Sequence, residues 1–113
     1  MQSINGVPLW YIESVFKIDS NSKTGLSWRV RKDSSKKWNS KHGNKVAGYR
    51  HKSNVNKKET WRVDIKYGYN VYKLFVHRVV WLLSRGDIGC VKIGHKNGDS
   101  LDNRVENLKE LIG

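Results

Sequence analysis

The run Ile93-Gly94-His95-Lys96-Asn97-Gly98-Asp99-Ser100-Leu101-Asp102-Asn103-Arg104-Val105-Glu106-Asn107-Leu108 decides how the last part of this chain folds. The apolar residues Val91–Ile93 predict the end of a strand, and the polar residues 96–100 predict a tight loop. A helix is expected to begin at Asn103, which can act as its N-cap, with Glu106 as the capping-box partner three residues later. The stretch therefore predicts a strand, a loop and a helix.

The predicted helix has an apolar face and an asparagine face. Helical spacing places four apolar side chains on the first face: Leu101, Val105, Leu108 and Ile112. Asn103 and Asn107 are four residues apart and share the other face, which can look back at His95 on the strand. A strand histidine set against two helix asparagines predicts a one-metal hydrolytic site.

The same stretch resembles the HNH endonucleases, or ββα-metal nucleases, and in particular those of phage type. The family pattern runs from Asp-His through a glycine loop to an Asn, and then to a helix with Asn or His before a Leu. His95, Asn103 and Asn107 take the three named positions, whereas Gly94 stands where the family has its aspartate. The His77-Arg78 pair before an apolar segment is a further mark of the family, and looser similarity extends the resemblance over residues 10–112.

The resemblance implies a small α+β domain with β-hairpins and a ββα-metal (His-Me finger) HNH core. The implied activity is cleavage or nicking of DNA with Mg²⁺ or another divalent cation such as Mn²⁺. In that reading His95 is the catalytic general base, because histidine can take a proton from water near neutral pH. Asn107 is the metal ligand, through its side-chain oxygen. Asn103 holds the catalytic loop and caps the helix.

The charge of the chain points to the same partner. The formal net charge is +12, and residues 28–58 carry eleven Lys and Arg against one Asp, which gives +10 for that segment alone. A polyanion such as DNA is the expected partner, and a solvated lysine-rich loop is the alternative. We predict DNA contacts by six basic residues of this segment: Arg29, Arg31, Lys36, Lys37, Arg50 and Lys52. For His77 and Arg78 the resemblance implies phosphate contact or support of the site, and packing alone is the alternative. Trp28, Trp38 and Tyr49 can stack on bases, although core packing is the alternative for Trp28.

The length of 113 residues predicts one domain over 1–113, with a basic DNA-contacting part at 1–58 and the hairpin and HNH motif at 59–113. A helix is expected at 8–18 with an apolar face of Trp10, Ile12, Val15 and Phe16, followed by a strand from Leu26 to Val30. Residues 31–45 and 51–59 are expected as loops around a short strand at 46–50. A hairpin of strands 61–67 and 71–76 is expected to lead into a helix, Arg78–Arg85, that Gly86 ends.

Several classes of protein are disfavoured. The single cysteine, Cys90, allows neither an internal disulfide nor a cysteine-based zinc cage. No apolar run is long enough to cross a membrane, and the N-terminus has no signal-peptide pattern. We therefore expect a cytoplasmic protein, in the host cytoplasm if phage-encoded, and a monomer. The sequence indicates no protein partner.

Gly94 leaves two functions open. Glycine supplies no carboxylate, and a neutral asparagine is a weak anchor for a hard cation. The chain is then either an endonuclease impaired at this position or an HNH-fold protein that binds DNA without cutting it. The sequence also leaves open the preferred DNA sequence and the choice between nicking and double-strand cleavage.

Overall fold

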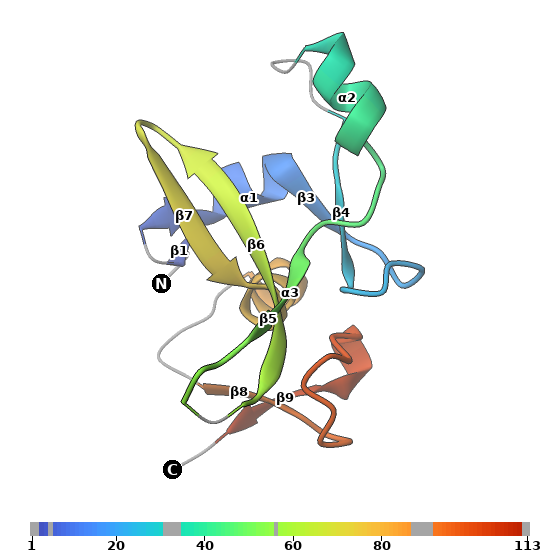
Figure 1. Cartoon of the computed structure of the whole chain (residues 1–113), viewed down its shortest axis with the longest axis vertical. Helices are drawn as coiled ribbons and strands as arrows, with labels where there is room; N and C mark the ends of the chain where they lie inside the picture. The colour runs from blue at the N-terminus through green and yellow to red at the C-terminus, as the bar shows by residue number, and fades with distance from the viewer. Residues whose placement is uncertain (1–2, 5, 31–34, 56, 87–91, 112–113) are drawn as a thin grey trace.

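A computed structural model describes residues 3–4, 6–30, 35–55, 57–86 and 92–111 (Figure 1). Over these residues the fold is a small domain of helices and antiparallel strands, so the predicted α+β class is confirmed. The helices are α1 (Leu9–Val15), α2 (Lys36–His42), α3 (Val76–Arg85) and the 3₁₀ turn η1 (Val105–Asn107). The strands form four antiparallel sheets: β1 (Ser3–Ile4) with β2 (Val7–Pro8), β3 (Phe16–Ile18) with β4 (Leu26–Trp28), β5 (Tyr49–Lys52) with β6 (Glu59–Tyr67) and β7 (Asn70–Phe75), and β8 (Lys92–His95) with β9 (Leu108–Leu111).

Helix α3 lies at the centre of the core (Figure 1). Its buried side chains recur at helical spacing and pack against α1, β3, β6 and β8. Gly86 ends the helix in the left-handed conformation, with φ of 76°, and its N–H bonds the Leu82 carbonyl at 2.7 Å. The predicted helix and its glycine stop are confirmed, although the helix begins at Val76 rather than at Arg78.

The hairpin of β6 and β7 follows the predicted alternation. Trp61, Val63 and Ile65 are buried, and the residues between them point away from the core. Gly68, with φ of 63°, makes the turn. Strand β5 pairs with β6 from Tyr49↔Arg62 to Lys52↔Glu59. One sheet therefore contains strands from both of the predicted parts, 1–58 and 59–113.

The amino-terminal prediction is wrong in three respects. The helix stops at Val15, because Phe16–Ile18 pairs with Leu26–Trp28 as strand β3. Trp10 is 65% exposed and takes no part in the core, whereas Ile12, Val15 and Phe16 are buried as expected. Val30 lies beyond the end of β4 and is 58% exposed.

The stretch expected as a loop at 31–45 contains helix α2. Ser35 is its N-cap, and its hydroxyl accepts a hydrogen bond from the Trp38 N–H at 3.1 Å. Trp38 and His42, four residues apart, pack their rings together at 5.1 Å. The short strand expected at 46–50 lies later, as β5, while Val46 makes only an isolated bridge to Ser27.

The helix expected from Asn103 is also wrong. After the turn η1 the chain continues as β9, which pairs with β8 from Lys92↔Leu111 to His95↔Leu108. Leu108 is buried by this pairing, which also satisfies backbone groups that a helix would have bonded internally. The helix that packs against β8 is therefore α3, which precedes it in the chain. The expectations for Arg31, Cys90, Val91 and Ile112 lie outside the described residues.

We predict that Leu82→Ala lowers the free energy of unfolding by about 2–5 kcal/mol, because it removes a fully buried side chain from the packed face of α3. Val71→Ala is the control: Val71 is 61% exposed, and its truncation is expected to change stability by less than about 0.5 kcal/mol. Urea denaturation followed by tryptophan fluorescence measures both. Equal effects would contradict the central place of α3.

Candidate active site

His95 stands at the end of β8, half-buried, opposite Leu108 of β9. Its Nε2 lies 2.7 Å from the side-chain oxygen Oδ1 of Asn103. A carbonyl oxygen can only accept a hydrogen bond, so Nε2 must carry the proton and donate it. In the neutral ring the lone pair is then on Nδ1, which is the atom able to take a proton from water.

Asn103 has its own orientation fixed by the other half of the chain. Its side chain is almost fully buried, and its Nδ2 donates to the Thr24 carbonyl at 3.2 Å. Because that carbonyl is also only an acceptor, the amide nitrogen must face Thr24 and the amide oxygen must face His95. Asn103 does not cap a helix, but it links Thr24 to the imidazole.

The turn that carries Thr24 is held in place by its own hydrogen bonds and leaves room for Asn103 to lie against it. The Thr24 hydroxyl donates to the Ala47 carbonyl at 2.6 Å, which ties the turn to the chain before β5. Gly25 has φ of +89°, and a Cβ there would lie 3.0 Å from the Asn103 carbonyl oxygen. The contact joins residues 79 positions apart, and no local sequence pattern predicts it.

Asn107 holds the loop between β8 and β9. It is 5% exposed, and its Nδ2 donates to Asn97 Oδ1 at 3.0 Å and to the Asp102 carbonyl at 2.8 Å. Its Oδ1 accepts from the Asn97 N–H at 3.2 Å. These bonds favour a structural role for the amide, and the metal-ligand role of Asn107 stays a prediction.

The side chains around His95 do not fit a protein-held Mg²⁺ ion. Among the described residues there is no group of three His, Cys, Asp or Glu side chains that could hold a metal. Gly94 presents no ligand, and Asp99 accepts from the Leu101 N–H at 3.0 Å within the loop. Asp102 bonds Arg104 at 2.8 and 2.9 Å, and this hydrogen bonding is the main cause that lowers the pKa of Asp102 to about 2. The negative charge of Asp102 is therefore paired with Arg104 within the loop.

A second histidine lies beside the first. His77, in the first turn of α3, has its ring centroid 5.4 Å from that of His95. Its Nδ1 is buried and has no hydrogen-bond partner among the described residues. Burial lowers the pKa of His77 to about 4, with smaller contributions from His95, Arg78 and Lys58, so the ring is neutral at pH 7.

The residues predicted to contact DNA fall in separate places. His77 and Arg78 begin α3 near His95, and Lys52 lies exposed on β5. Arg50 pairs with Glu59 at 3.3 Å, and the Arg29 Nε donates to the carbonyls of Glu13 and Phe16. Lys36 and Lys37 are exposed on α2, which lies at the opposite end of the molecule from β8 and β9 (Figure 1).

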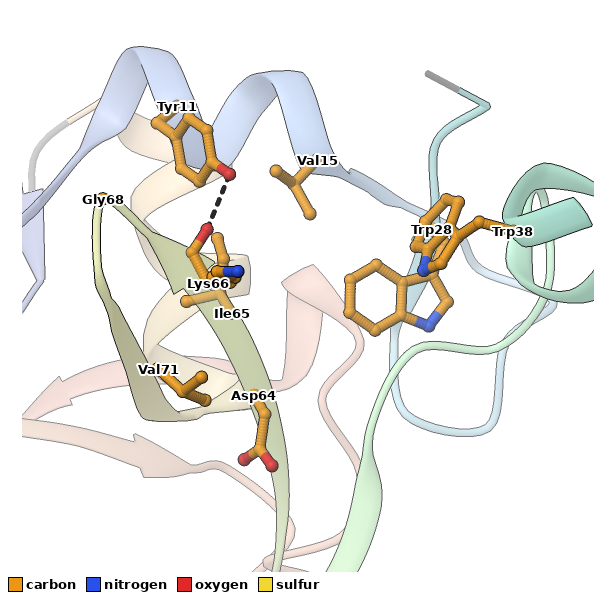
Figure 2. A pocket seen from close by; sticks show the side chains of 9 residues that line it. All are labelled: Tyr11, Val15, Trp28, Trp38, Asp64, Ile65, Lys66, Gly68 and Val71. Carbon is orange, nitrogen blue, oxygen red and sulfur yellow. Dashed lines mark hydrogen bonds between the residues drawn. The ribbon is translucent and has the colours of Figure 1, made fainter. Parts of the chain in front are cut away.

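A pocket of about 550 Å³ lies apart from His95, between α1, β6 and the tryptophans of β4 and α2 (Figure 2). Tyr11 closes one side and donates to the Lys66 carbonyl at 2.6 Å. The ring of Trp28 packs against Phe16, with the ring centroids 4.7 Å apart, and meets Trp38 edge-on, with the centroids 5.6 Å apart. Core packing therefore accounts for one side of Trp28, and base stacking by Trp28, Trp38 and Tyr49 stays a prediction.

Comparison with known proteins finds one family match, which covers the segment that carries His95. Residues 74–111, about a third of the chain, match the family model HNH_3, described as HNH endonuclease. The predicted HNH endonuclease family is confirmed for this segment, which carries His77, His95, Asn103 and Asn107. The phage subtype stays a prediction. No curated protein and no solved structure matches the chain. None of the described helices is long and apolar enough to span a bilayer.

The lowered pKa of His77 predicts a loss of stability in mild acid. Between pH 6.5 and about 4 the unfolded chain binds a proton at this position and the folded chain does not. The free energy of unfolding should therefore fall by up to about 3 kcal/mol from this residue as the pH drops through that window. His77→Phe keeps a ring but cannot titrate, so the free energy of unfolding of this variant should change less with pH. Parallel curves for the two proteins in urea unfolding at pH 4–7 would show that His77 is not the cause.

Proposed function

We propose that the chain is a DNA endonuclease or nickase in which His95 is the general base for hydrolysis of a phosphodiester bond. The observation that carries the proposal is the hydrogen-bonded series from the Thr24 carbonyl through Asn103 to His95 Nε2. Support also comes from the HNH family match over 74–111 and from the net charge of +12, which favours a polyanionic substrate.

In this mechanism Nδ1 of His95 removes a proton from the attacking water, and the resulting imidazolium is stabilised because its Nε2–H already donates to Asn103. Asn103 is a positioning residue: it sets the ring orientation and the tautomer. Asn107 and Asn97 hold the loop that follows His95, and so keep Asn103 within reach of the ring.

Dependence on Mg²⁺ or Mn²⁺ belongs to the proposal on the strength of the family resemblance. A bound cation would stabilise negative charge on the phosphate. The donors around His95 do not fit such an ion, so no step is assigned to it.

A second function, DNA binding without cleavage, is favoured by one specific observation. Gly94 stands at the position of the family aspartate, and no acidic cluster replaces it among the described residues. The two functions share the basic surface and differ in whether the bond is cut.

We predict that His95→Ala abolishes plasmid nicking while DNA affinity stays near that of the parent chain. Asn103→Leu, which keeps the volume but not the hydrogen bonds, should slow nicking by about 10- to 100-fold. Circular dichroism and DNA binding control for folding. If His95→Ala nicks DNA at the parent rate, His95 is not the base. If no protein nicks DNA under any metal condition but all bind it, the binding function replaces the proposal.

We also predict that a carboxylate at position 94 increases metal-dependent nicking. A Cβ on Gly94 would lie 2.8 Å from Cδ2 of Leu111, which is 44% exposed, so room is made by pairing Gly94→Asp with Leu111→Ala. The matched control is Gly94→Ala with Leu111→Ala, which differs only in the carboxylate.

The measurement is nicking rate against Mg²⁺ concentration for both double variants. The aspartate protein is expected to cut faster and at lower Mg²⁺ than the alanine protein. The added carboxylate should both strengthen Mg²⁺ binding and raise the rate of nicking. Identical curves would refute the argument that a ligand is missing at position 94.

A further inference from the structure

A pocket of about 430 Å³ beside His77 is lined by positive charge. Basic side chains and histidines reach it from four elements: His51, Lys58, Arg62, His77, Arg78 and Lys92. No acidic residue is among the described residues that line it. Cationic side chains gathered in one concave place without counter-charge raise the local concentration of anions.

Two buried nitrogen atoms in this pocket lack the partners that buried polar groups normally have. Arg62 Nε and His77 Nδ1 are buried and unbonded among the described residues. The guanidinium of Arg62 is held in place over the ring of Phe75, at 4.7 Å from its centroid. A buried guanidinium N–H that has no hydrogen-bond partner among the described residues fits an incoming acceptor oxygen.

The N-terminus of α3 opens on the same pocket. Phe75 is the N-cap residue and offers no side-chain hydrogen bond, and His77 and Arg78 of the first turn line the pocket. The first N–H groups of this ten-residue helix therefore have no side-chain cap, and the helix dipole favours negative charge there.

The pocket also adjoins the place where His95 would act. His95 lines a smaller pocket of about 240 Å³, and the two pockets share Lys58, Ile93 and Leu111. One polyanionic strand can therefore reach both.

We propose that this pocket is a phosphate subsite, built by Arg62, the first turn of α3 and Lys92, that holds a phosphate of the bound DNA strand next to the one cleaved at His95. The inference rests on the proposed function, because it takes DNA as the ligand. It adds Arg62 as the central contact, with His77, Arg78 and Lys92 around it. Such a contact fixes the strand relative to the base and carries no sequence preference.

The test measures binding without cleavage. In the His95→Ala background, a fluorescently labelled DNA duplex is titrated with protein at several NaCl concentrations. Arg62→Gln should weaken binding by about tenfold at low salt and reduce the slope of log K against log salt by about 0.9, the value for one phosphate. Arg62→Lys keeps the charge, so it should keep the slope while losing part of the affinity.

Lys73→Gln is the matched control, because it removes the same charge from an exposed position of the β6–β7 hairpin that does not line the pocket. The melting temperature of Arg62→Gln without DNA should fall only slightly, since the lost Nε–H has no hydrogen-bond partner among the described residues and the contact removed is the one with the Phe75 ring. A loss of affinity no larger than that of Lys73→Gln, or a fall in melting temperature that accounts for it, would overturn the proposal.

A second arm distinguishes a free anion from a DNA phosphate. Inorganic phosphate is added to the parent and to Arg62→Gln, and the melting temperature is followed. If phosphate stabilises only the parent and Arg62→Gln also loses DNA affinity, the subsite holds strand phosphate. If phosphate stabilises the parent but DNA binding is unchanged in Arg62→Gln, the pocket takes a free anion and the proposal is wrong. If the parent chain binds no DNA at all, both this inference and the proposed function fail.

Discussion

The hydrogen bond between His95 Nε2 and Asn103 Oδ1, at 2.7 Å, is the constraint on which the candidate site depends. The Thr24 carbonyl accepts a hydrogen bond from Nδ2 of the same amide, and this bond fixes which end of the Asn103 amide faces His95. With both ends fixed, the imidazole has one tautomer and one orientation, and its basic atom is Nδ1. A histidine on a short two-stranded hairpin is thereby made rigid without a carboxylate partner.

This constraint explains why residues far apart in the sequence must fold together. The turn at Thr24 belongs to the amino-terminal half, and Gly25 gives the Asn103 backbone the space that a Cβ would fill. Helix α3, packed against β8, brings His77 beside His95. The positive charge divides accordingly: one part surrounds the start of α3 near His95, and another lies on α2 at the far end (Figure 1). Under the proposed function one DNA duplex spans both ends, since phosphates repeat along its length.

The spacing of apolar residues correctly predicted the helix and strands that bury one face in the core. It did not predict segments whose secondary structure depends on pairing with another strand. The alternation from Trp61 to Tyr67 and the glycine after Arg85 correctly predicted β6 and α3. The asparagines at 103 and 107 suited a helix cap and a helix face, yet the chain makes only the short turn η1 there and then continues as β9, because pairing with β8 decides the fold after Asn107. The bond from Asn103 to Thr24 spans 79 residues, and no local pattern encodes a contact at that separation. Helix α2 was missed because its packing depends on two aromatic rings rather than on an apolar stripe.

Asn103 fixes the tautomer of His95 if this hydrogen bond controls the site, and nitrogen NMR of the imidazole detects the tautomer. In ¹⁵N-labelled protein above neutral pH, long-range ¹H–¹⁵N spectra distinguish a protonated from an unprotonated ring nitrogen. We expect a protonated Nε2 and an unprotonated Nδ1 for His95 in the parent chain, and a mixture of tautomers in Asn103→Leu. A His95 ring that carries its proton on Nδ1, or that shows the same mixture in both proteins, would contradict this expectation.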